Sequence, residues 1–124
     1  MDSDPLPLLG PARTIDYAVD AQGRRHARDF LHEKCPTKDA KSIFHKCRVM
    51  AEHGAQGLQR EAFKHEAGEI FAFKSFQARV AAFQQGKTWF LTHGFIKKKD
   101  KWPPAELTRA ERIRLEHLSR RGGP

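Results

Sequence analysis

Residues 69–96, EIFAFKSFQARVAAFQQGKTWFLTHGFI, contain three segments that are rich in aromatic and other strand-forming residues. The segments span residues 69–75, 78–84 and 87–96, and their length and composition are typical of β-strands. Gln85-Gly86 separates the second segment from the third, and this dipeptide favours a tight turn. We therefore expect three consecutive antiparallel strands in this part of the chain.

The residues before this stretch predict one short strand and two helices. We expect the strand at residues 14–19 and the first helix at residues 24–34, where apolar residues recur at helical spacing. Pro36 ends the first helix, Thr37 can cap the second, and Gly54 is a natural stop for it. The second helix carries one apolar stripe, which consists of Ala40, Ile43, Phe44, Cys47, Met50 and Ala51.

A last helix is predicted at residues 106–121, because Pro103-Pro104 can begin a helix where the missing N–H does no harm. The expected fold class is α+β, in the order β-α-α-β-β-β-α: an antiparallel sheet with an N-terminal helical hairpin and a C-terminal helix, and with the helices on one face of the sheet. Residues 1–13 are expected to form a flexible N-terminal tail, and residues 14–121 a single domain.

The charge of the chain points to an acidic partner. Its 124 residues carry 23 Lys and Arg against 15 Asp and Glu, a formal net charge of +8. Such a surplus on a small domain favours binding to a polyanion or to an acidic protein. No apolar run approaches the length of a membrane span, and Cys35 and Cys47 do not make a disulfide framework. We therefore expect a cytoplasmic protein without a membrane partner.

The predicted strands gather basic side chains on one surface. Phe71 and Phe73 share one face of their strand, which makes it the core side, so Lys74 faces outward on the other side. Arg79 faces outward from the next strand, and His93 lies near the end of the third. A cleft floored by this sheet would collect Lys74, Arg79, His93, Lys97, Lys98 and Lys99, with Lys64 and His65 on the preceding loop.

Such a set of residues suits the cleavage of an RNA phosphodiester. The 2′-hydroxyl must lose a proton, the phosphorane carries extra negative charge, and the 5′-oxygen must gain a proton. Histidine or lysine can move protons, and Arg and Lys can stabilise the charge, so we expect neither a metal nor another cofactor. Alternatively, Lys74 and Arg79 are solvated charges on an exposed sheet face, and His93 is a structural histidine.

Residues 63–104, FKHEAGEIFAFKSFQARVAAFQQGKTWFLTHGFIKKKDKWPP, resemble the central motif of RelE/HigB-type toxins of bacterial toxin–antitoxin systems, especially the phage-associated HigB-like subgroup. Phe63-Lys64 stands before the first motif strand, residues 69–74 match that strand, and Arg79-Val80 opens the second. The third strand closes with the element His93-Gly94-Phe95-Ile96-Lys97-Lys98. The likeness extends over about residues 14–120.

This resemblance implies a barnase/RelE-like ribonuclease architecture and a ribosome-dependent mRNA interferase, with a helix-turn-helix antitoxin encoded beside it. The expected function is the toxin of a type II toxin–antitoxin pair, an endoribonuclease that cleaves mRNA on the ribosome by metal-independent attack of the 2′-hydroxyl. The expected catalytic residues are Lys74, Arg79 and His93. The expected RNA-binding residues are Lys64, Lys97, Lys98 and Lys99.

Three features of the sequence depart from the family pattern. Ala72 stands where the first motif strand has an acid, and Lys74 stands where it has an arginine. No tyrosine or acid follows His93 in the way that several family members have one. These departures favour an alternative, in which a catalytically silent basic protein of the same fold docks on RNA or on a host protein.

Overall fold

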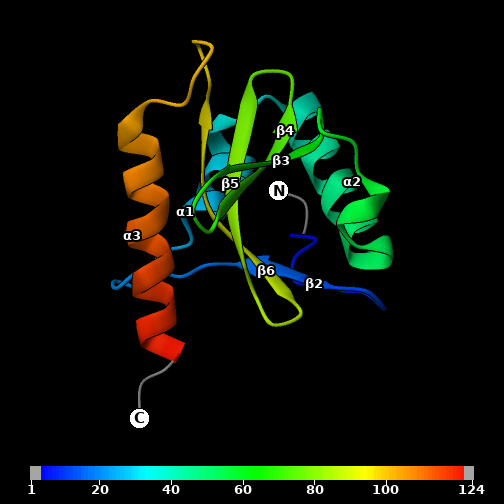
Figure 1. The fold of residues 1–124 in the computed structure, drawn as a ribbon, viewed down its shortest axis with the longest axis horizontal. Helices are drawn as coiled ribbons and strands as arrows, with labels where there is room; N and C mark the ends of the chain where they lie inside the picture. Colours follow the sequence, from blue (N-terminus) through cyan, green and yellow to red (C-terminus); the bar gives the residue numbers. More distant parts are fainter. Residues whose placement is uncertain (1–3, 122–124) are drawn as a thin grey trace.

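The computed structural model describes residues 4–121 and contains one mixed sheet with helices on both of its faces (Figure 1). Six strands of this part of the chain lie in the order β1-β2-β6-β5-β4-β3. Their bounds are Leu8–Leu9 (β1), Thr14–Tyr17 (β2), Phe63–Ala67 (β3), Ile70–Ser75 (β4), Ala78–Gln85 (β5) and Thr88–Ile96 (β6). Neighbouring strands are antiparallel except β2 and β6, which are parallel. The α+β class is as expected, and the architecture is compatible with a barnase/RelE-like fold.

The helical segments divide between the two faces of the sheet. They are α1 (His26–Asp29), the π-helical turn η1 (Phe30–Lys34) that continues it, α2 (Thr37–His53), the 3₁₀ turn η2 (Ala55–Gly57) and α3 (Pro104–Arg121). One core cluster joins α1, η1 and α2 to the side chains of Phe73, Val80 and Leu91. A second cluster joins α3 to the opposite face, through Ala110 and Ile113.

The three expected central strands are confirmed as β4, β5 and β6, each within one residue of its predicted bounds. Gly86 takes a φ of 60° in the turn between β5 and β6, where glycine avoids the steric penalty of a side chain. In the β4–β5 ladder, Lys74 is paired with Arg79, and in the β5–β6 ladder Arg79 is paired with Phe95. This register places Lys74, Arg79 and Phe95 on the same face of the sheet, the one that α3 partly covers.

The prediction that all helices pack on one face was wrong. Ile70 and Ala72 of β4, on the side opposite Phe73, are buried beneath α3 together with Ala81 and Phe83 of β5. Strands that are covered on both faces carry apolar residues at nearly every position. The small alanines among these residues hide that pattern, because they add little apolar character to a face.

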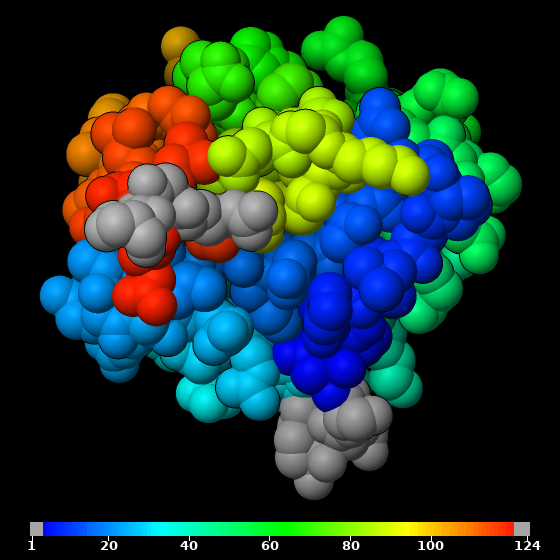
Figure 2. Space-filling model, turned by 90° about the horizontal axis from the view of Figure 1, so that it is seen from below, coloured from blue at the N-terminus to red at the C-terminus, as the bar shows by residue number. Residues whose placement is uncertain are grey.

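The expected flexible tail and the expected loop before β4 each contain a strand. Leu8–Leu9 pairs with β2, and the Tyr17 hydroxyl donates a hydrogen bond of 2.8 Å to Asp4. Figure 2 shows the described part of the N-terminal segment, drawn in blue, lying against the body of the molecule. Residues 64 and 65, expected on a loop, belong to β3. The observed element order therefore has two more strands than predicted, while residues 1–3 lie outside the described part.

A bulge in β6 sets the environment of His93. Val80 pairs with Gly94 and Ala82 with Leu91, so that two residues of β6, Thr92 and His93, face a single residue of β5. A bulge of this kind re-aims side chains. Gly94 lies directly against the Phe30 ring, and a Cβ at this position would collide with it.

Candidate nucleic-acid interface

A basic cleft lies at the end of the sheet where the β4–β5 turn is hydrogen-bonded to the end of β6. Figure 1 shows this turn and the loop after β6 at the same end of the molecule. The volume of the cleft is about 290 Å³, and the cleft lies beside the first turns of α3. The lining residues are Lys64, Glu66, Lys74, Arg79, Lys97, Asp100, Lys101, Trp102 and Leu107. Five of them are cations and two are carboxylates, so the basic cleft carries an excess of positive charge.

The strand register brings these cations together. Lys74 and Arg79 are direct cross-strand partners, and such pairs have Cβ atoms about 5 Å apart. Lys64 of β3 is paired with Ala72, two residues from Lys74 along β4. Like charges placed directly opposite each other are destabilising. The β4–β5 hairpin therefore holds a cation pair that an anionic ligand would stabilise.

The two central cations are held by backbone carbonyl groups. Arg79 Nη1 donates hydrogen bonds to the carbonyl oxygens of Phe76, at 2.7 Å, and Ala78, at 3.1 Å. Lys74 Nζ has a longer contact of 3.4 Å with the carbonyl oxygen of Arg60. Carbonyl groups orient these side chains without neutralising them, so both charges remain available to a ligand.

Burial lowers the pKa of Lys74 below its usual value, and the charges of Arg79, Lys64 and Lys97 lower it further. Burial also lowers the pKa of Arg79, whereas the carboxylate of Glu66 opposes the shift in both residues. The direction of the shift makes Lys74 a stronger acid than an exposed lysine. It can therefore give up a proton more readily than a surface lysine can.

Four of the seven expected site residues line the basic cleft: Lys64, Lys74, Arg79 and Lys97. Lys98 and Lys99 are exposed on the loop that follows β6 and are not among the lining residues. His65, expected near the cleft, instead packs its ring against Phe71, on the face of the sheet opposite Lys74. The structure thus brings together the strand cations and separates them from part of the lysine run.

His93 is placed apart from the basic cleft and is 0 % exposed. Its Nε2 lies 2.9 Å from Oε1 of Glu106 in α3, and its Nδ1 lies 3.3 Å from the Thr92 hydroxyl. Burial and the nearby charge of Arg109 lower the pKa of His93 to about 3, so the ring is neutral and donates its Nε2–H to Glu106. In this arrangement His93 connects β6 to the start of α3 and does not reach the cleft.

The carboxylates of the basic cleft, Glu66 and Asp100, were missed by the sequence reasoning. Glu66 sits where the β3–β4 register shifts between His65 and Ala67, so simple alternation does not give its direction. The sequence did contain one signal for Glu66. Ala72 stands where the first motif strand of the family has an acid, and an acid from a neighbouring strand can take that place in the cleft, as Glu66 of β3 does by position. Trp102 was also missed as a lining residue, and its ring packs edge-on against Phe95 at a centroid distance of 4.8 Å.

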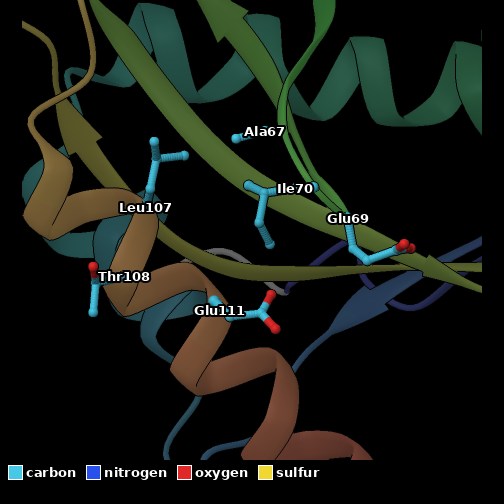
Figure 3. A pocket seen from close by; sticks show the side chains of 7 residues that line it. Ala67, Glu69, Ile70, Leu107, Thr108 and Glu111 are labelled. Atoms are coloured by element: carbon cyan, nitrogen blue, oxygen red, sulfur yellow. The ribbon is translucent and has the colours of Figure 1, made fainter.

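A second hollow lies between the β3–β4 turn and α3 and has a different character (Figure 3). Ile70 and Leu107 give it an apolar centre, and Glu69 and Glu111 stand at its sides. Leu107 also lines the basic cleft, so the two hollows adjoin. The carboxylates of the second hollow would repel a polyanion, so this hollow does not suit RNA.

Within residues 4–121, no group of three or more His, Cys, Asp and Glu side chains is arranged to hold a metal ion. The helices in the same range are too short or too polar to cross a membrane.

Comparison with known protein families gives a match. The family model described as "Phage derived protein Gp49-like (DUF891)" matches residues 31–115, which is more than half of the chain. The matched region runs from η1 into α3 and includes every lining residue of the basic cleft. No curated protein matches the chain significantly.

Proposed function

Because the chain belongs to the Gp49-like family of phage-derived proteins, a RelE/HigB-like toxin family, we propose that it is the toxin of a type II toxin–antitoxin pair and that it cleaves mRNA. The observation that carries this proposal is the basic cleft, in which the cross-strand pair Lys74 and Arg79 lies beside the carboxylate of Glu66. The cleft combines groups that bind phosphate with groups that can move protons.

The proposed reaction is attack of the RNA 2′-hydroxyl on the neighbouring phosphorus. Glu66 accepts the proton of the 2′-hydroxyl, and Arg79 stabilises the additional negative charge of the phosphorane. Lys74, whose pKa is lowered, donates a proton to the 5′-oxygen as the phosphorus–oxygen bond breaks. The products are a 2′,3′-cyclic phosphate and a 5′-hydroxyl end, and no metal takes part in these steps.

The remaining cations are assigned to the flanking phosphates. Lys64, Lys97 and Lys101 line the basic cleft, and Lys98 and Lys99 extend the positive surface along the loop. Phosphate contacts of this kind position a nucleic acid without reading its sequence. We propose mRNA on the ribosome as the substrate and a helix-turn-helix antitoxin as the protein partner.

The catalytic role of His93 stays a prediction. The burial of its side chain argues against that role. A group that transfers a proton must lie within hydrogen-bond reach of the substrate, and His93 is enclosed by Thr92, Phe95 and Glu106. We propose that it is a positioning residue instead. It holds the start of α3, and with it the wall of the basic cleft at Trp102 and Leu107.

Induced expression in bacteria tests the proposal, with growth and the 5′ ends of mRNA as the measurements. We expect growth arrest and new 5′-hydroxyl ends with the natural sequence, little of either with Lys74→Ala, and slower cleavage with Lys74→Arg, because a guanidinium keeps the positive charge but does not give up its proton. Lys87→Ala is a matched control, because Lys87 is exposed beside the β5–β6 turn. If the natural sequence neither arrests growth nor cleaves mRNA on translating ribosomes, the silent binding protein favoured by Ala72 and Lys74 becomes the better account.

A further inference from the structure

Phe76 occupies the tip of the β4–β5 hairpin in an unusual state. The loop between Ser75 and Ala78 has two residues, Phe76 and Gln77, and the Phe76 side chain is 83 % exposed. Its φ is 53°, the one positive value among the non-glycine residues that the structure describes. Turns of this length favour Gly, Asn or Asp at positive φ. A bulky side chain in this conformation is an outlier that invites a functional explanation.

The hairpin tip is attached to the basic cleft through its backbone. The Phe76 carbonyl oxygen accepts the 2.7 Å hydrogen bond from Arg79 Nη1, and the Gln77 carbonyl oxygen accepts one of 2.7 Å from the backbone N–H of Lys97. Phe76 is two residues from Lys74, so their Cα atoms are at most about 7 Å apart. The exposed ring is therefore borne by the same turn that orients the cations of the cleft.

The Phe76 ring belongs to neither of the two core clusters formed by residues 4–121. Among residues 4–121, the large hydrophobic side chains that are exposed are those of Leu9, Phe76 and Leu115. Leu9 lies in β1, at the opposite edge of the sheet, and Leu115 lies on α3. Phe76 alone of the three is aromatic, and its carbonyl group is hydrogen-bonded to Arg79 of the basic cleft. An aromatic face beside a positive groove is the combination that binds single-stranded nucleic acid, by base stacking together with phosphate contacts.

We propose that Phe76 is a stacking platform for one unpaired nucleobase of the RNA that the basic cleft holds. This inference rests on the proposed function and goes further, because it names a residue that fixes where the strand lies. A base stacked on Phe76 sets which phosphate of the chain reaches Arg79 and Lys74. Stacking is tolerant of base identity, so Phe76 positions the strand more than it selects a sequence.

Binding of a short single-stranded RNA that carries 2-aminopurine tests this inference, with anisotropy and 2-aminopurine fluorescence measured at low ionic strength. Phe76→Leu keeps the apolar character but removes the ring. We expect it to weaken binding by about 5- to 140-fold, the loss of one base–aromatic stack, and to abolish the fluorescence quench. Phe76→Trp should retain both signals. Leu9→Ala, which removes another exposed apolar side chain, should change neither.

Phe76→Gly separates a binding role from a structural one. Glycine adopts positive φ freely, so this variant should melt no lower than the natural sequence while it binds RNA as weakly as Phe76→Leu. A lower melting temperature would show that the ring serves the fold and would overturn the inference.

The remaining outcomes distinguish the inference from the function on which it rests. If the natural protein and Phe76→Leu bind RNA with equal affinity and equal quench, the stacking role is overturned and the proposed function stands. If Phe76→Leu binds RNA normally but loses the antitoxin, the ring is a protein contact, and the stacking role is again overturned. If the natural protein binds no RNA, and Lys74→Ala changes neither growth arrest nor mRNA cleavage, both the cleft assignment and the stacking role fail.

Discussion

The β4–β5 hairpin has two halves that differ on the face toward α3. In one half, Ile70, Ala72 and Phe83 are buried beneath the helix. In the other half, Lys74 and Arg79 line an open cleft. The apolar half fixes the register, and that register then determines which cations meet at the tip. Because burying unpaired charges is unfavourable, the cations can only lie where the cover of α3 ends.

Replacing Phe83 should break the apolar half and give the largest effect. Phe83 is 1 % exposed, and its ring packs against Phe90 at a centroid distance of 5.5 Å. Phe83→Ala is expected to lower the free energy of unfolding by about 3–5 kcal/mol, measured by urea denaturation. Phe76→Ala is the matched control on the same hairpin, because Phe76 is exposed and its truncation leaves no cavity. Equal destabilisation by the two variants would contradict the division into halves.

Replacing Arg79 should affect the basic half alone. Removing one charge-stabilising donor typically lowers the rate by about 10²–10³-fold, so Arg79→Ala should reduce mRNA cleavage on translating ribosomes by that amount. Among the hydrogen bonds of residues 4–121, those of the guanidinium go only to backbone carbonyl groups, so the melting temperature should change little. A variant that melts much earlier, or one that cleaves at the normal rate, would contradict this assignment.

Acidification should loosen the contact between β6 and α3. The pKa of His93 is lowered to about 3 in the folded protein, whereas an unperturbed histidine has a value of about 6.5. Between these values the unfolded chain binds the proton and the folded one does not, so stability falls as the pH decreases from about 6.5 toward 3. The slope contributed by His93 approaches about 1.4 kcal/mol per pH unit.

Denaturation at several pH values measures this slope, and His93→Gln is the informative variant because its side chain does not titrate. It should be less stable at neutral pH, where it loses the contact with Glu106, but its stability should depend less on pH between 6.5 and 4. An unchanged pH dependence would mean that His93 is charged in the folded protein.

The smallest effect is expected at the rim of the basic cleft. Lys97→Ala should flatten the slope of log affinity against log salt by about 0.7 unit, the value for one phosphate contact on a single strand. Lys98→Ala and Lys99→Ala should each flatten it less, because these residues lie outside the lining. Lys87→Ala should leave the slope unchanged, and a change there as large as for Lys97 would indicate diffuse binding.

The sequence predicted the elements that rest on alternation and on turn residues. The central strands, and the grouping of Lys74 with Arg79, follow from the period of two in β4 and β5. His93 and Glu66 escaped this reasoning because each lies at a register shift, where the period is broken. The sequence therefore did not determine on which face of β6 the His93 side chain lies. Its burial beside Glu106 depends on the position of α3, which the sequence pattern does not give.

Other features depend on partners that are distant in the chain. Leu8–Leu9 is too short to show any periodicity, and it is a strand only because β2 offers an edge to it. Likewise, the alanines Ala72 and Ala81 carry little apolar signal, although they form a smooth surface for α3. Local patterns do not contain this information, since it belongs to the packing of distant segments.

The parallel pairing of β2 with β6 has a consequence for the order of events during synthesis. Thr14 lies opposite Thr88, and Tyr17 lies opposite Leu91. Contacts between such distant segments form late, because a long loop must close first. The N-terminal strand β2 can therefore pair with β6 only after most of the chain has left the ribosome. The basic cleft forms later still, because Lys97 and Leu107 line it. On the function proposed above, we expect a nascent chain to be harmless to the ribosome that makes it until its last helix has been translated.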